Sequence, residues 1–153
     1  MSFELKCNEA GQTDEDAIKQ YRTQRSPKSR LFLFKAGTLV NFAMDLNEVH
    51  MCTRLEKEKT YFLPFNMGNG EGVDAGKGNP LRTDDYPVCY MWKDVLTKDS
   101  VLELIKKFIF VEKKEKKDEN GKPLKGAKPK ESLIFPRYHQ RSAIQSLLKD
   151  VKE

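Results

Sequence analysis

Few residues of this chain have the chemistry for cross-links or for a cysteine-rich metal site. Its three cysteines, Cys7, Cys52 and Cys89, lie far apart among 153 residues, and it contains only two histidines. No Cys-x-x-Cys pair occurs, and no histidine stands at metal-ligand spacing. The pattern therefore excludes a disulfide framework and a zinc knuckle, and it favours a reducing, cytoplasmic setting.

Long apolar runs are absent as well. No run approaches the roughly 20 residues that a membrane-spanning helix needs, and the first residues lack the apolar stretch of a signal peptide. We therefore expect a soluble chain without membrane contact. Its 28 Lys and Arg residues exceed its 23 Asp and Glu residues. This mild excess permits contact with a polyanion such as DNA without establishing it.

The N-terminal part of the chain has strand and helix patterns in turn. One strand precedes a helix that Thr13 can cap, and further, mostly antiparallel strands follow. These elements are expected at 2–7, 13–25, 31–35, 38–45 and 48–55. They predict a small α/β layer with part of its sheet buried.

Two charged residues of the first strand, Glu4 and Lys6, stand two apart and should share one face. From spacing alone, the pair is either an exposed ion pair or half of a metal site. His50 alternates on a later strand. We interpret it as a surface or packed histidine, because no Ser or Cys partner can be placed beside it.

Glycine is concentrated in the segment 67–80, which has no hydrophobic periodicity and is expected to be a loop. Its AGKG stretch, 75–78, lacks both the spacing and the hydroxyl of a phosphate-binding loop. A helix is expected at 99–111, a charged and solvated linker at 113–131, and a final helix after Pro136.

Several blocks of the sequence carry a resemblance to a known family. FELKCNEAGQTDEDAIKQY, TYFLPFNMGNGEG, YPVCYMWKDVL and LIFPRYHQ follow one another as in the restriction (R) subunit of type I restriction-modification enzymes. The resemblance implies a nuclease of the PD-(D/E)xK type followed by a superfamily 2 motor that is driven by ATP and translocates DNA. It also implies modification and specificity subunits as partners.

This resemblance assigns a fold to each part of the chain. The fold would be α/β, an incomplete mixed sheet of the nuclease core with a flanking helix, followed by a Gly-rich loop and a mainly helical C-terminal part. The implied parts are the second half of the nuclease core, a Gly-rich connector, a helical spacer, a charged linker and the start of the motor. They cover 1–66, 67–98, 99–112, 113–131 and 132–153.

The ELK stretch would then be the ExK half of the nuclease motif. Glu4 would bind Mg²⁺, and Lys6 would orient or activate the attacking water. Gln20 would be the glutamine of the following helix, although the family's tyrosine four residues later is Gln24 here and Tyr21 is adjacent. The family's upstream Asp has no counterpart before ELK. We therefore expect half a metal site and an inactive isolated chain.

PRYHQ resembles the adenine-recognition motif that precedes the phosphate loop of such motors. Gln140 would pair with adenine of ATP, with Tyr138 or Phe135 near the base. From the residues alone, a polar cap at a helix start is the favoured interpretation of Gln140. Two other functions stay open for the chain: a small basic DNA-binding module without catalysis, and an inactive remnant of a truncated gene.

Overall fold

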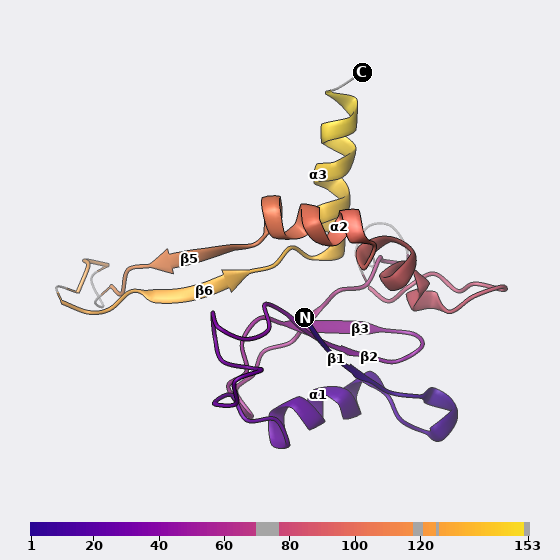
Figure 1. The fold of residues 1–153 in the computed structure, drawn as a ribbon, viewed down its shortest axis with the longest axis horizontal. Helices are drawn as coiled ribbons and strands as arrows, with labels where there is room; N and C mark the ends of the chain where they lie inside the picture. Colours follow the sequence, from indigo (N-terminus) through magenta and orange to yellow (C-terminus); the bar gives the residue numbers. More distant parts are fainter. Residues whose placement is uncertain (70–76, 118–120, 125, 152–153) are drawn as a thin grey trace.

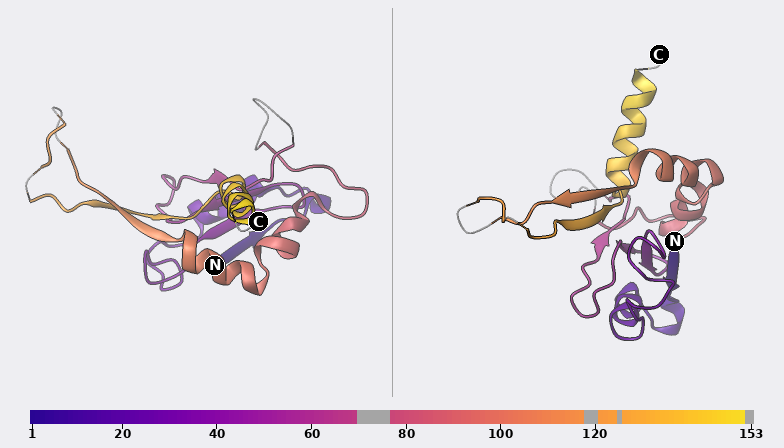
Figure 2. Two further views of the ribbon diagram at one scale, coloured as in Figure 1. Left: turned by 90° about the horizontal axis from the view of Figure 1, so that it is seen from above. Right: turned by 60° about the vertical axis from the view of Figure 1, so that its left-hand side comes forward.

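The computed structural model describes residues 1–69, 77–117, 121–124 and 126–151. It has the expected mixed α/β class: a four-stranded sheet of order β1-β2-β3-β4 and a two-stranded sheet, β5-β6, that projects from the body (Figures 1 and 2). The strands are Ser2–Leu5 (β1), Asn41–Met44 (β2), Val49–Cys52 (β3), Leu63–Pro64 (β4), Phe110–Lys114 (β5) and Lys130–Ile134 (β6). The helices are Asp14–Thr23 (α1), Lys98–Glu103 (α2) and Tyr138–Asp150 (α3), with shorter helical turns at Asn8–Ala10 (η1), Pro87–Cys89 (η3), Met91–Val95 (η4) and Leu104–Phe108 (η5).

The pairing of β1 with β2 is parallel, so the chain has to cross over between them. Helix α1 lies in this crossover and covers one face of the sheet (Figure 1). Acidic side chains fill its first turn, and the N–H of Thr13 donates to Oδ2 of Asp16 (3.0 Å). The expected helix with its N-cap at Thr13 is therefore confirmed.

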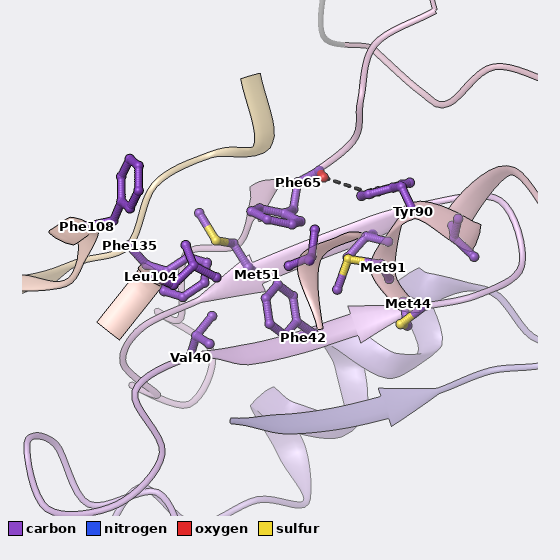
Figure 3. Packing of buried hydrophobic residues seen from close by; sticks show 13 residues of the cluster. Val40, Phe42, Met44, Met51, Phe65, Tyr90, Met91, Leu104, Phe108 and Phe135 are labelled. Carbon is purple, nitrogen blue, oxygen red and sulfur yellow. Dashed lines mark hydrogen bonds between the residues drawn. The ribbon is translucent and has the colours of Figure 1, made fainter. Parts of the chain in front are cut away.

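Both faces of the sheet are covered, and β2 is buried throughout. On the α1 face, Ala17 and Tyr21 of α1 pack with Ala43 of β2 and Cys52 of β3. The other face is covered by the segment from η3 to η5 and by Phe135. Figure 3 shows the side chains of this larger core, which include Phe42, Met51, Phe65, Tyr90, Met91 and Leu104.

The expected strand at 31–35 is wrong, because this stretch consists of turns. Lys35 has a positive φ of 67°, and the N–H groups of Gly37 and Thr38 donate back to the carbonyls of Leu33 and Leu31. A Cβ at Gly37 would lie 2.1 Å from the carbonyl oxygen of Leu31. Glycine therefore permits this tight return of the chain.

The expectations for the C-terminal half need two corrections. The helix expected at 99–111 ends with η5, and Ile109 already has extended backbone angles. The segment 113–131 is not a linker at its two ends, because these belong to β5 and β6, which pair in antiparallel fashion. Pairing between β5 and β6 thus orders the ends of this segment, although its charged composition predicts a solvated linker.

Within the block YPVCYMW, Tyr90 and Met91 are core residues, whereas Trp92 is 46% exposed. The described ends of the Gly-rich segment, 67–69 and 77–80, contain no helix or strand, as expected, and residues 70–76 lie outside the described residues. None of the helices in the described part of the chain combines the length and apolar character that crossing a bilayer requires.

Helix α3 extends away from the sheet (Figure 1). One buried side chain, that of Arg141, links its first turns to η4 and α2. The guanidinium of Arg141 donates to both carboxylate oxygens of Asp94 (2.7 and 2.9 Å) and to Oγ of Ser100 (2.9 Å). Leu147 and Val151, further along the helix, are exposed. Docking of α3 therefore depends strongly on Arg141.

We expect Arg141→Leu to lower the free energy of unfolding by about 2 kcal/mol, because charged hydrogen bonds are lost and Asp94, being partly exposed, regains water. Urea unfolding followed by the fluorescence of Trp92, the only tryptophan, measures this change near Asp94. The exposed Lys149→Leu on the same helix is the control. Equal stability of Arg141→Leu and the unsubstituted chain would contradict this role.

Candidate functional site

Alternate residues of β1 face α1. Ser2 contacts Tyr21, with 2.9 Å between the two hydroxyl oxygens, and Nζ of Lys6 donates to Oε1 of Gln20 (2.7 Å). Glu4, between them, contacts Arg25, just beyond α1. Glu4 and Lys6 thus lie on the face expected from strand alternation, with β2 beside β1, whereas the stretch 31–35 forms no neighbouring strand. Their catalytic role stays a prediction.

Glu4 is held in an ion pair. Nε and Nη2 of Arg25 both lie 2.5 Å from Oε1 of Glu4, whose side chain is 15% exposed. The hydrogen bond to Glu4 raises the pKa of Arg25 above its usual value. The carboxylate predicted to hold a metal ion therefore carries a neutralising partner.

Gln20 and its neighbour Tyr21 have different environments. Gln20 is half-buried and binds Lys6, as a positioning residue would. Tyr21 is fully buried, its hydroxyl donates to the carbonyl of Phe42, and burial raises its pKa far above the usual value. The structure thus brings Gln20, but not the Tyr21 hydroxyl, to Lys6.

The two residues predicted to contact adenine do not converge. Oε1 of Gln140 accepts a hydrogen bond from the N–H of Arg137 (2.9 Å), and Gln140 lines an open, mainly apolar hollow with Phe108, Phe110 and Pro136. Tyr138 packs instead against the rings of Phe65 and Tyr90 in the core. Gln140 therefore does cap the helix start, and its nucleotide role stays a prediction.

A third group of side chains, which the sequence did not single out, gathers where α1 begins. Asp14 starts α1, Glu48 precedes β3, and His50 lies on β3. Their ligand atoms all lie within 4.8 Å of one another, and Nδ1 of His50 is 2.7 Å from Oδ2 of Asp14. The Asp14 carboxylate raises the pKa of His50, although burial opposes this shift.

Asp45 fixes the backbone around this group. Its Oδ1 accepts from the N–H groups of Asn47 and Glu48, and its Oδ2 from Nδ2 of Asn8 and the N–H of Asp14. Burial alone would raise the pKa of Asp45, but these hydrogen bonds outweigh it and lower the pKa. Asp45 therefore connects the ends of β1 and β2 with the start of α1.

One sequence signal could have found this group. Asp45 directly follows the buried strand β2 and Glu48 ends the same turn before β3. Polar residues at the carboxyl ends of parallel strands often mark a binding crevice. Asp14 has a simpler explanation, as an acidic residue that the helix dipole favours. His50 joins the group only through the register of β3, which the sequence leaves open.

Comparisons of the chain with models of protein families, with curated proteins and with solved structures found no match. The resemblance to type I restriction subunits therefore stays a prediction. The geometry of Glu4, Lys6 and Gln20, together with that of the group around His50, is what bears on function.

We expect Asp45→Ala to lower the free energy of unfolding by about 3 kcal/mol, because the buried N–H of Asp14 and the partly buried N–H groups of Asn47 and Glu48 lose their acceptor. Asp45→Asn keeps one acceptor oxygen and should cost less. Denaturant unfolding in the presence of a chelator measures both values, with the exposed Asp84→Ala as the control. If Asp45→Ala proved as stable as that control, the network would not hold these loops.

Proposed function

We propose that this chain is a segment of the DNA-cleaving, ATP-driven subunit of a type I restriction enzyme, which acts with modification and specificity subunits. The observation that carries the proposal is the position of Glu4, Lys6 and Gln20. Glu4 on β1 and Lys6 directly after it both face the α1 side, and Gln20 binds the Lys6 ammonium. These are the residues that the resemblance assigns to the nuclease.

The arrangement around Lys6 suits phosphodiester hydrolysis. An ammonium group beside the attacked phosphate stabilises the negative charge that grows in the transition state. The hydrogen bond to Gln20 restrains the flexible lysine side chain, so less rotamer freedom is lost when DNA binds. We infer that Gln20 positions Lys6 and that Lys6 contacts the phosphate or its attacking water.

The residues around Glu4 do not by themselves fit a Mg²⁺ site. Magnesium prefers several oxygen ligands, usually with carboxylates among them, whereas Glu4 offers one carboxylate that Arg25 already neutralises. Magnesium-dependent cleavage by the proposed enzyme therefore requires that Arg25 release Glu4 and that a further carboxylate join it. In the sheet formed by the described residues β1 is an edge strand, so its unpaired edge is where a further strand would pair.

The proposed ATP site has one supporting feature. The apolar hollow beside Gln140 suits a flat base, and an amide can pair with the N6 and N7 atoms of adenine. Two such hydrogen bonds cannot offset the cost of association, so most of the affinity for ATP must come from groups that bind its phosphates. We therefore assign adenine discrimination to Gln140 and leave Tyr138 in the core.

The projecting hairpin formed by β5 and β6 has features that favour DNA contact. Such contact would suit the proposed enzyme and also the alternative function, a basic DNA-binding module. Lys114 and Lys130 stand directly opposite each other across β5 and β6, an arrangement that costs stability unless an anion lies between them. Lys114 also pairs with Glu112 (3.1 Å), whereas Lys130 has no ion pair among the described residues. A phosphate backbone would neutralise both ammonium groups.

Restriction in the cell tests the nuclease assignment. Replacing Glu4 by Ala in the gene should lower restriction of unmodified phage by at least about 100-fold, because the chemical step is lost. Lys6→Ala should act similarly, and the exposed Glu9→Ala should restrict normally. Normal restriction by Glu4→Ala would exclude the proposed nuclease site.

DNA binding tests the hairpin separately. Lys114→Glu combined with Lys130→Glu should weaken duplex binding at least about 10-fold and reduce the slope of log affinity against log salt by about 2, one for each lost phosphate contact. Fluorescence anisotropy with labelled duplex measures both quantities. The same change at the exposed Lys19 and Lys28 of the α1 side is the charge-matched control. Equal loss in both double variants would show that only net charge matters.

A further inference from the structure

The group around His50 lies in a hollow at the carboxyl ends of the parallel strands β1 and β2. The hollow is lined by residues of three elements, among them Asn8 after β1, Asp45 and Glu48 after β2, and Asp14 at the start of α1. In open α/β sheets, ligands bind in the crevice beyond the carboxyl ends of the strands. The position of the hollow is therefore one where a ligand is expected.

The donor atoms in this hollow are mixed. Asp14 and Glu48 offer carboxylate oxygens and His50 offers a ring nitrogen, all within 4.8 Å of one another. Magnesium and calcium prefer oxygen donors alone, whereas an imidazole together with carboxylates suits zinc and its neighbours in the first transition series. The donor set therefore favours zinc and similar transition-metal ions over magnesium and calcium.

His50 provides an independent observation. Its Nδ1 is fully buried and has no hydrogen-bond partner among the described residues, although Oδ2 of Asp14 lies only 2.7 Å away. At this distance the two groups form an ion pair when the ring is protonated, which agrees with the raised pKa of His50, but the ring hydrogen does not meet hydrogen-bond geometry, so a neutral ring nitrogen is left without a partner. A cation that both atoms bind would satisfy the ring nitrogen and also explain why the oxygen lies beside it.

The surroundings hold the donors in place and supply negative charge. Asp45 binds the backbone N–H groups of Asp14 and Glu48, so two of the three donors are fixed by hydrogen bonds that do not use their own side chains. Among the described residues, four acidic side chains line the hollow and no Lys or Arg does. Within this part of the chain, no fixed cation on the walls therefore neutralises the carboxylates.

We propose that Asp14, Glu48 and His50 bind one divalent transition-metal ion of the zinc type. Three protein ligands leave at least one coordination position for water, as in zinc sites that are not purely structural. The ion joins the first turn of α1 to β3. The site is separate from Glu4 and Lys6, which contact the C-terminal half of α1 and the turn after it.

Calorimetric titration of the chelator-treated chain with ZnCl₂ in excess Mg²⁺ tests the proposal. We expect one ion per chain, bound at micromolar concentration or tighter, with a rise in the unfolding temperature. Glu48→Gln and His50→Ala should each weaken binding by at least about 100-fold, more than loss of an outer-shell partner usually costs. Glu48 lies in a turn, so Glu48→Gln is the variant that should leave folding unchanged.

Controls distinguish this site from other zinc ligands of the chain. Cys7→Ser and His139→Ala remove an exposed thiol and the other histidine, and both should bind zinc normally. Cobalt in place of zinc should give visible bands without thiolate charge transfer, since the proposed ligands contain no sulfur. The proposal would be overturned if the chain did not bind zinc, or if Glu48→Gln and His50→Ala still bound it normally. A thiolate band in the cobalt spectrum would overturn it as well.

Discussion

The burial of β2 on both faces is the constraint on which the rest of the structure depends. Because all four of its residues are buried, each face of the sheet needs its own cover, which α1 provides on one side and the segment from η3 to η5 on the other. Strand alternation then decides which neighbours face which cover. Phe3, Phe42, Met51 and Leu63 form one row across the sheet, on the side of the larger core.

The same registers place the polar residues. Glu4, Ala43 and His50 are paired in a row across β1, β2 and β3, and this row faces α1. A one-residue slip of β1 would send Glu4 into the larger core and Phe3 toward the helix. The stacking of Phe3 on Phe42, with 5.2 Å between ring centroids, opposes such a slip. Apolar packing on one face thus fixes the charged groups on the other.

Elements that are determined by neighbouring residues could be predicted from the sequence. Alternation placed Glu4 and Lys6 on one face of a strand, and the acidic first turn after Thr13 placed α1 correctly. The turns at 31–35 could not be predicted from β-forming residues alone, because such propensities depend on the surroundings. Leu31 and Leu33 are exposed there, and Gly37 closes the turn.

Structure that depends on residues far away in the sequence was missed for a different reason. Residues 109–111 continue the apolar pattern of the preceding helix, yet they are extended because the strand Lys130–Ile134 pairs with Phe110–Lys114. No pattern within residues 99–111 indicates that this strand will pair with them. The group of Asp14, Glu48 and His50 was missed likewise, since Asp14 comes from a different segment than Glu48 and His50, and the two segments meet only after the sheet has formed. Spacing rules detect sites whose residues are close in sequence.

Helix α1 connects the two candidate sites physically. Its first residue belongs to the group around His50, and its second half contacts Lys6 through Gln20. Both sets of contacts require the helix to lie close to the sheet, and the residues between them are small where it crosses β2. Ala17 and Ala43 are both completely buried in the cluster between helix and sheet. A larger side chain at either alanine would have to push the helix outward, since packed interiors have little free space. The distances from Asp14 to His50 and from Gln20 to Lys6 would then lengthen together, so the two sites share one geometric cause although they differ in chemistry.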